Sequence, residues 1–465
     1  MRASAQTRPA STRSLRMVLA LACVSQFMVI LDASIVNVAL PSVQRELGFS
    51  GVGLAWVVNG YLLTFAGFLL LGGRAADLFG RRRMLVVGLA VFSASSLVAG
   101  VATTPAVLVA ARIVQGIGAA MLAPATLAVL NTTFTEPHER ARAFGAWSAA
   151  GGIGGTAGAV AGGAITTGLS WRWVFLINVP IGAALIVVAL LSLSAVRPVR
   201  RESLDLVGAV TATAGLAAAI YGVMQSADHS WTALRVAGPV VAGLVLLVAF
   251  TVVEARTAVQ PMVPLRLFGS RSVAVGTGML LLFGGIAIAM WYFSSLFLQN
   301  VLGYSALRSG LGQTPAAVTF VVVARLATAL LPRVGVRALI LTGSALFLAG
   351  FGWLSQASAD SSYLTGLLGP TLLVAAGIGL TFPTLMATVT ADAAAEDAGI
   401  VGGLSNTASQ VGGSVGLAVL TTVAGDGAST AEALPAGYDR VFLVAAGLGT
   451  AIALISLLLP RSSRA

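Results

Sequence analysis

The stretch Gly73-Arg74-Ala75-Ala76-Asp77-Leu78-Phe79-Gly80-Arg81-Arg82-Arg83 lies between two long apolar runs of the chain. Three consecutive arginines cannot rest in hydrocarbon, so the stretch predicts a short loop at a membrane surface. Its two glycines, Gly73 and Gly80, permit a tight turn. Asp77 stands about one turn before the arginines, where it can hold one of them or cap the next helix. The excess of arginine predicts that this surface is cytoplasmic.

The composition on both sides of this stretch excludes a soluble protein. The chain has 465 residues, of which 57% are hydrophobic and 9% are charged, and its mean hydropathy is +0.94. A soluble chain of this length cannot hide so much apolar surface. Repeated runs of about 20 apolar residues instead predict a helical protein that crosses the membrane many times.

About fourteen spans are expected from these runs. An even number of spans puts both chain ends on one side of the membrane. The expected spans lie near residues 15–40, 54–73, 84–103, 105–131, 142–167, 173–195, 206–225, 236–254, 272–296, 309–331, 337–356, 364–390, 400–425 and 440–460.

The distribution of the arginines among the loops agrees with an even number of spans. The net charge of +11 raises the question of nucleic-acid binding, but the arginines cluster in short loops, where they act as topology signals. No nucleic-acid partner is therefore expected, and both termini are predicted to be cytoplasmic. The richer set of loops and tails holds Arg81 to Arg83, Arg140, Arg142, Arg197, Arg200, Arg201, Arg256, Arg266, Arg271, Arg333, Arg337, Arg461 and Arg464. The other set holds Arg45, Arg172, Arg235, Arg308 and Arg440.

Metal and disulfide chemistry is not expected. His138 and His229 are far apart in sequence and fall in predicted loops, and the single Cys23 lies in an apolar run. These residues offer neither a ligand cluster nor an intrachain disulfide.

A weak internal repeat suggests two six-helix halves. The run Pro332 to Arg337 is similar to Asp77 to Arg82, and Gly116-Ile117-Gly118 before Pro124 recurs as Gly377-Ile378-Gly379 before Pro383. In a chain so rich in Gly and Ala, such similarities could also arise by chance. The predicted organisation is a cytoplasmic tail (1–16), an N-terminal six-helix bundle (17–195), two linker helices (196–256), a C-terminal six-helix bundle (257–460) and a second tail (461–465).

Two charges inside predicted spans are the first candidates for function. Asp32 stands eight residues before Leu40 and Arg112 seven residues after Pro105, so both lie roughly 10–12 Å from the same membrane face at 1.5 Å per residue. They are natural partners, because an unpaired charge inside a span costs several kcal/mol. Gln115 follows Arg112 by three residues and shares its helical face. A static ion pair that only fixes packing is the alternative.

A glycine-rich span provides a second pattern. Gly154, Gly158 and Gly162 recur every four residues, and Gly163 follows. This tandem GxxxG spacing places the first three on one helix face and lets a neighbouring backbone approach closely.

Several of these motifs resemble the major facilitator superfamily. Six residues match the pattern of its loop between the second and third helices: Gly73, Ala76, Asp77, Gly80, Arg81 and Arg82. Ala75 stands where Leu is expected and Leu78 where a basic residue is expected. The run from Ala111 to Ala120 resembles the fourth-helix motif, and the glycine run resembles the fifth-helix motif of exporters, with Ala159 in place of Pro.

Further motifs are similar to one branch, the fourteen-helix drug:proton antiporter-2 family. They are Leu31 to Pro41, Trp171 to Gly182, Phe297-Leu298-Gln299 and Asn406 to Gly413. The resemblance implies an all-α membrane protein of two pseudo-symmetric six-helix bundles plus two inserted helices. It implies proton-coupled efflux of an amphipathic small molecule, such as an antibiotic, drug or secondary metabolite, across the cytoplasmic membrane by a monomer with no cofactor but the proton.

The resemblance also assigns roles to residues. Asp32 and Arg112 are expected to couple protons, and Gly73, Asp77, Gly80, Arg81 and Arg82 to form a conformational gate. Polar side chains expected to line a substrate cavity are Asn37, Gln115, Arg325, Asn406 and Gln410. Arg325 has an alternative role, because its side chain can snorkel to the membrane surface near Arg333.

Other functions remain open at this point. A proton-coupled importer of a metabolite shares these motifs, and a membrane-embedded sensor would bind a ligand without flux. A membrane-embedded enzyme is not expected, because the spans show no cluster of His, Ser or acidic residues.

Overall fold

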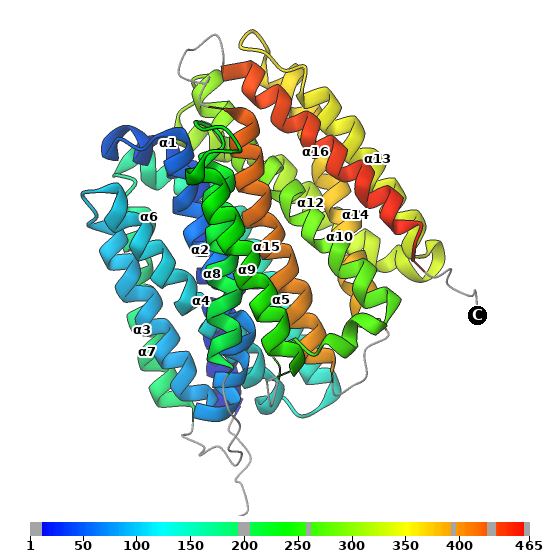
Figure 1. The fold of residues 1–465 in the computed structure, drawn as a ribbon. Helices are drawn as coiled ribbons and strands as arrows, with labels where there is room; N and C mark the ends of the chain where they lie inside the picture. Colours follow the sequence, from blue (N-terminus) through cyan, green and yellow to red (C-terminus); the bar gives the residue numbers. More distant parts are fainter. Residues whose placement is uncertain are drawn as a thin grey trace, which may run out of the picture.

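The computed structural model consists of long helices that run roughly parallel to one another (Figure 1). It describes residues 12–193, 205–256, 261, 263–391, 397–425 and 434–459, apart from the side chains of a few of them, including Asp77. The helices are α1 (Thr12–Leu47), α2 (Gly51–Phe79), α3 (Arg81–Gly100), α4 (Pro105–Thr133), α5 (Pro137–Gly168), α6 (Trp173–Leu176), α7 (Asn178–Ser192), α8 (Leu206–Gln225), α9 (Leu234–Arg256), η1 (Leu265–Gly269), α10 (Arg271–Ile288), η2 (Ala289–Phe293), α11 (Ser294–Leu296), η3 (Phe297–Val301), α12 (Ala306–Val334), α13 (Val336–Leu354), η4 (Tyr363–Leu368), α14 (Gly369–Ala391), α15 (Ala398–Ala424) and α16 (Leu434–Ser456).

Twelve helices among the described residues are long and apolar enough to cross a membrane, counting α6 with α7, α10 through η3, and η4 with α14 each as one. Two further helices, α5 and α15, have 32 and 27 residues but are rich in glycine, which adds little apolar surface. All fourteen predicted spans therefore exist as helical segments, while composition alone supports twelve of them as membrane spans.

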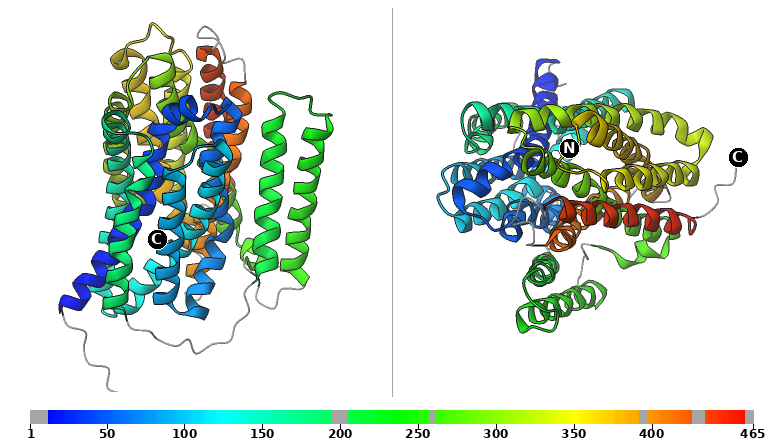
Figure 2. Two further views of the ribbon diagram at one scale, coloured as in Figure 1. Left: turned by 90° about the vertical axis from the view of Figure 1, so that its left-hand side faces the viewer. Right: turned by 90° about the horizontal axis from the view of Figure 1, so that it is seen from above.

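The helices form two bundles, as the sequence predicts. In the N-terminal bundle α1 packs on α5, and α4 packs on α2 and α3; in the C-terminal bundle α10 packs on α15, and α14 packs on α12 and α13. Figure 1 shows the two bundles side by side, and Figure 2 shows α8 and α9 as a hairpin at their periphery. Residues 1–11 and 194–204 lie outside the described part, and α1 begins inside the predicted tail.

The stretch Gly73 to Arg83 is mostly helical, which corrects the prediction of a loop. Helix α2 continues through Gly73 to Phe79 and α3 starts at Arg81, so Gly80 alone makes the turn, with φ of +92°. Only a residue without a Cβ adopts this conformation without strain. Gly335 joins α12 to α13 in the same way, with φ of +84°, so the predicted repeat is present in the backbone.

The first helix is longer than predicted. Helix α1 does not end near Leu40 but passes Pro41 and reaches Leu47. Asp32 therefore lies about 22 Å from the end of this helix at 1.5 Å per residue, rather than about 12 Å. We call the end of the bundles that carries Arg81 to Arg83 the basic face, and the end where α1 terminates the opposite face.

The glycines of α5 bring three helices close together. A Cβ on Gly154, Gly158 or Gly162 would meet α1 at 2.8 Å or less, while a Cβ on Gly152 would meet nothing within 4 Å. On another side of α5, a Cβ on Gly163 would lie 2.6 Å from the carbonyl oxygen of Ala306 in α12. Helix α5 thus packs tightly on its own bundle and on the other one.

Candidate functional site: a buried charge network and a vestibule

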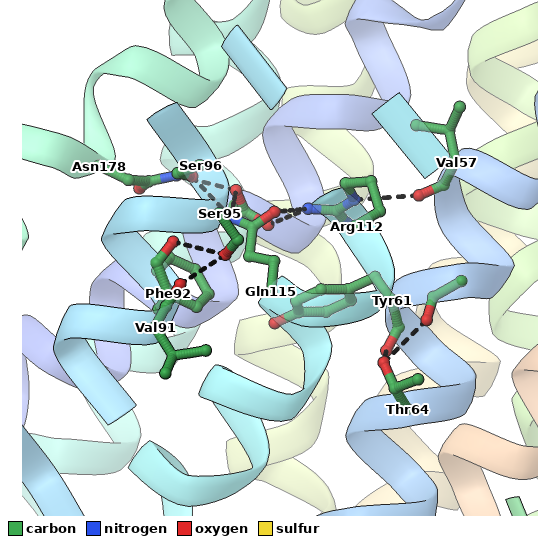
Figure 3. A network of polar contacts seen from close by, with 12 residues as sticks. Val57, Tyr61, Thr64, Val91, Phe92, Ser95, Ser96, Arg112, Gln115 and Asn178 are labelled. Carbon is green, nitrogen blue, oxygen red and sulfur yellow. Dashed lines mark hydrogen bonds and ion pairs between the residues drawn. The ribbon is translucent and has the colours of Figure 1, made fainter. Parts of the chain in front are cut away.

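A fully buried ion pair lies in the N-terminal bundle. Arg112 Nη1 of α4 donates to Asp32 Oδ2 of α1 at 2.6 Å, and the two side chains are 1% and 0% exposed. The sequence predicted this pairing and the structure confirms the contact, although α1 extends further beyond Asp32 than the predicted depth assumed. Figure 3 shows the polar network that surrounds Arg112 and Gln115.

Three further polar side chains complete the network. Gln115 Nε2 donates to Asp32 Oδ1 at 2.8 Å, and Asn178 Nδ2 of α7 donates to the same oxygen at 2.9 Å. Both amides also reach Ser96 Oγ of α3, at 2.7 and 3.0 Å. The carboxylate thus has three donors from two helices, which offsets much of the cost of burying its charge.

Arg112 is held on its other sides as well. Its Nε donates to the carbonyl oxygen of Val57 in α2 at 3.0 Å, and its Nη1 also donates to Gln115 Oε1 at 2.7 Å. The guanidinium carbon lies 4.2 Å from the ring centroid of Tyr61, a cation–π contact. The network therefore joins α1, α2, α3, α4 and α7 around one buried charge pair.

The network contains a single carboxylate opposite a single cation, so its charges balance only while both groups are ionised. Protonating Asp32 would remove the negative charge and leave the guanidinium of Arg112 with neutral acceptors only. A buried cation without a counter-charge is costly, so the arrangement of these helices would become less stable. Both side chains are shielded from solvent in this structure, so a proton could reach them only in a different arrangement.

The predicted cavity residues are dispersed. Gln115 is fully buried and is hydrogen-bonded within the network. Asn37 and Gln410 are half-buried, while Arg325 and Asn406 are exposed. The side-chain oxygen of Asn37 is buried without a hydrogen-bond partner. The role of these residues in substrate binding remains a prediction.

The predicted gate residues lie where α2 meets α3. Arg82 Nη2 donates to the carbonyl oxygen of Leu190 in α7 at 3.0 Å, and Gly73 lies next to Pro124 of α4. The side chain of Asp77 lies outside the described part of the chain. Their role as a gate is therefore still a prediction.

A second ion pair, which the sequence did not suggest, lies at the basic face of the C-terminal bundle. Arg266 of η1 binds Asp397 with both nitrogens, at 2.7 and 2.8 Å. These hydrogen bonds hold the pKa of Asp397 below its ordinary value. The pair ties the segment that follows α9 to the start of α15.

A cavity of about 1250 Å³ opens at the opposite face; we call it the vestibule. It lies between the bundles, since its wall combines the ends of α1, α2 and α5 with the segment 292–306 and the ends of α15 and α16. None of the five predicted cavity residues lines it. Its wall includes Pro41, Ser42, Arg45, Phe49, Thr166, Thr167, Tyr292, Phe293, Leu296, Gln299, Asn300, Tyr304, Thr421 and Tyr438.

Comparison with known proteins identifies the architecture. The sequence model of the Major Facilitator Superfamily matches residues 22–417. The chain belongs to the Major Facilitator Superfamily. It is therefore a multi-pass membrane transporter, as the motifs around Asp77, Arg112 and Gly158 predict.

Its relatives include named export and resistance proteins. The chain is 46% identical to the cephamycin export protein of Amycolatopsis lactamdurans, over 99% of this chain and 96% of that protein. It is 40% identical to the puromycin resistance protein of Streptomyces alboniger, over 86% of this chain and 80% of that protein.

Solved structures support the fold. The nucleoside transporter NupG superposes with a TM-score of 0.67 at 14% identity, covering 95% of this chain and 99% of that one. A bacterial homologue of the human lysosomal transporter Spinster, in an inward-facing and unoccupied conformation, also gives 0.67 at 15% identity, covering 97% of both chains. At these identities the similarity concerns the fold alone.

Proposed function

We propose that this chain exports an amphipathic small molecule in exchange for protons, with Asp32 as the proton-binding group and Arg112 as its counter-charge. The direction of transport is supported by the relatives that are named for export of, or resistance to, antibiotics. The observation that carries the coupling is the buried pair itself, whose charges are balanced only while Asp32 is ionised.

The exchange would follow from the electrostatics of the pair. A proton that binds Asp32 weakens its attraction to Arg112 and favours a different arrangement of α1, α4 and α7. Release of the proton restores the pair and this structure. Each proton that enters down a potential of 100 mV supplies about 2.3 kcal/mol, which can drive export of a substrate against its gradient.

The test is uphill transport in proteoliposomes with an imposed pH gradient, with puromycin and a cephamycin as trial substrates. We expect Asp32→Asn to lose accumulation driven by the gradient while it retains downhill movement of substrate. Asp228→Asn is the control, because Asp228 is exposed in the turn between α8 and α9 and should transport normally. Uphill pumping by Asp32→Asn would show that the pair is a static packing element.

A folding defect must be separated from a coupling defect. Removing one partner of a buried ion pair costs about 3–5 kcal/mol, because the other charge is left unpaired. The double variant Asp32→Asn with Arg112→Gln removes both charges and should recover much of that stability. We expect it to elute as a folded protein in size-exclusion chromatography and still fail to respond to the pH gradient.

We also infer that the basic face is cytoplasmic and that both chain ends are on that side. The support is the asymmetry of the arginines between the two faces. In a Cys23→Ser background, Ser230→Cys at the opposite face should react with an impermeant thiol reagent in intact cells. Thr135→Cys at the basic face should react only after permeabilisation, and the reverse pattern would overturn the topology.

A further inference from the structure

The vestibule is large enough to hold a transported molecule. Its volume of about 1250 Å³ exceeds the roughly 300–1,000 Å³ of ordinary ligand pockets. Both bundles contribute to its wall, so any movement of one bundle against the other changes its shape. A cavity with these properties suits a molecule that is held and then released as the bundles move.

Two π-helical segments build much of its wall. Tyr292 and Phe293 belong to η2, and Gln299 and Asn300 belong to η3. Such segments are rare and are found mainly at functional sites, because the wider turn shifts side chains out of the regular helical positions. Here they turn rings and amides from a single interrupted helix toward the same cavity.

The aromatic part of the wall provides a rigid apolar surface. The rings of Phe293 and Tyr438 pack edge to face with centroids 6.4 Å apart, and Phe297 packs on Tyr438 from behind at 5.6 Å. The hydroxyl of Tyr438 accepts from Asn300 Nδ2 at 3.5 Å. These contacts fix the rings in place, so an apolar or aromatic part of a ligand would meet a preformed surface.

Two threonines, one from each bundle, belong to the wall and have buried hydroxyls. Thr166 Oγ1 of α5 and Thr421 Oγ1 of α15 are buried and have no hydrogen-bond partner among the described residues. Both residues line the vestibule. Their hydroxyl oxygens themselves have almost no accessible surface, so these two residues contribute shape to the wall rather than free hydrogen-bonding groups.

Arg45 is the one charged side chain in the described wall of the vestibule. Its hydrogen bonds go to neutral groups of its own helix, the carbonyl oxygen of Pro41 at 3.2 Å and Ser42 Oγ at 3.4 Å. The neighbouring Glu46 is already paired with Arg172 at 2.8 Å and accepts from Trp171 Nε1 at 2.6 Å. The charge of Arg45 is therefore uncompensated within that described wall.

The charge of Arg45 favours anionic ligands over cationic ones. Aromatic rings alone could also attract cations, by about 0.5–2 kcal/mol. An organic cation in the vestibule would, however, meet the positive charge of Arg45 and no carboxylate in the described wall. An anion would meet the same rings together with a favourable charge and free N–H donors.

We propose that the vestibule binds the transported molecule at the opposite face and selects neutral or anionic amphipaths with an aromatic part over organic cations. This inference rests on the proposed function for its biological meaning, but the binding itself does not depend on proton coupling. Arg45 acts as the selecting residue, and the π-helical wall supplies the apolar contact.

Two dyes with the same xanthene core and opposite charge test the selection. Fluorescein is anionic and rhodamine 6G is cationic at pH 7.5. Their binding to the purified full-length protein in lipid nanodiscs can be followed by fluorescence polarisation, with empty nanodiscs as the blank. We expect tighter binding of fluorescein, and a roughly tenfold loss of fluorescein affinity in Arg45→Glu, from the reversal of one nearby charge.

The matched control for charge is Arg440→Glu. Arg440 is an exposed arginine at the same face, and it is absent from the vestibule wall. Its reversal should change the affinity for either dye by less than twofold. Preference for rhodamine 6G in the wild type, or equal effects of the two substitutions, would overturn the proposal.

A filling variant tests the location. Leu296→Trp should weaken both dyes because the larger side chain occupies the vestibule, while Leu443→Trp, on an exposed side of α16, should not. If Leu296→Trp does not fold, the smaller change Leu296→Phe serves instead and should weaken both dyes several-fold. Unchanged binding in the folded variant would place the dyes elsewhere and refute the assignment.

The outcomes also separate this inference from the proposed function. Proton-driven transport with no effect of Arg45 on dye selection would leave the exporter intact and reject the selective vestibule. Charge-selective binding without any proton-driven flux would reject the exporter and retain the vestibule as a binding site.

Discussion

At the scale of single residues, the ring and the hydroxyl of the buried Tyr61 differ in whether they have an interaction partner. Its ring lies against the guanidinium of Arg112, whereas its hydroxyl is buried without a hydrogen-bond partner. We expect Tyr61→Phe to keep or slightly raise the melting temperature, because it removes an unsatisfied polar group. Tyr61→Leu should lower the free energy of unfolding by about 2 kcal/mol through loss of the cation–π contact.

Thermal unfolding of the purified protein in detergent measures both changes. Equal destabilisation by the two substitutions would mean that the hydroxyl has a partner that this structure does not contain, and that the ring contact is not the main interaction.

The sequence predicted only part of this network. Asp32 and Arg112 were found because a charge inside an apolar run is costly and needs a partner at the same depth. Asn178, Ser96 and Tyr61 were not assigned, because uncharged polar residues are tolerated in many positions of a span. Asn178 did carry a signal, since Asn-Val-Pro interrupts an apolar run between α6 and α7.

At the scale of helices, glycines on and off the packed face of α5 differ sharply in the space they leave for a side chain. A Cβ at position 158 would lie 2.6 Å from Ser34 Cβ, and one at position 152 would meet nothing within 4 Å. Gly158→Ala should therefore destabilise the protein by about 1–3 kcal/mol through overpacking. Gly152→Ala should be neutral or stabilise it by up to about 1 kcal/mol, because alanine is the better helix former.

Thermal unfolding and yield of the two alanine variants give the comparison. Similar losses from both substitutions would argue against close packing of α5 on α1 along a single face.

The pair between Arg266 and Asp397 predicts a dependence on pH. The pKa of Asp397 is lowered by its bonds to Arg266, so the pair contributes to stability above the ordinary value near 3.8. That contribution is lost as the pH falls through the lower pKa of the folded state. Asp397→Asn should thus reduce the melting temperature by a constant amount between pH 5 and 8, and the difference from wild type should shrink below about pH 4. A difference that grows on acidification would contradict this assignment.

Helix boundaries were harder to predict than helix existence. Leu40-Pro41 suggested an end to the first span, but proline interferes with a helix mainly through the preceding turn, and α1 continues to Leu47. The π-helical segments η2 and η3 left no mark in the apolar pattern, because the extra residue per turn is an effect of packing. The length of the loop between Gly73 and Arg83 was overestimated, since charged residues at a membrane surface are compatible with helical turns.

At the scale of the whole molecule, each bundle reaches across to the other through one glycine-rich helix. Helix α5 packs on α12, and α15 packs on α2. The inserted hairpin covers the second of these seams, since α8 contacts both α2 and α15. Asn59 of α2 lies where these three helices meet. Its side chain accepts a hydrogen bond from Ser414 Oγ of α15 at 2.9 Å and contacts Met224 of α8 at 3.8 Å. The seam between α5 and α12 has no such cover from the hairpin in Figure 2.

This uncovered seam is the place to test movement of the bundles. Its close contacts lie at the opposite face, where the backbone N–H of Leu307 donates to Thr167 Oγ1 at 3.2 Å. A transport cycle requires the bundles to move against each other, and a cross-link at this seam would hold them in the present arrangement. In a Cys23→Ser background, a disulfide between Thr167→Cys and Leu307→Cys should therefore stop transport, and a reductant should restore it.

The control joins two helices of one bundle. A Cβ on Gly151 of α5 would lie 3.3 Å from the side chain of Gln26 in α1, so Gly151→Cys with Gln26→Cys offers a cross-link that leaves the bundles free to move. We expect the oxidised control to transport at a rate close to that of its reduced form, measured in the same proteoliposomes. Because the two cross-links differ in whether they join the bundles, inhibition confined to the first would assign the block to the seam. Transport that survives complete cross-linking of Thr167→Cys to Leu307→Cys would mean that the substrate leaves without separation of α5 from α12, and the seam beside α8 would then have to open instead.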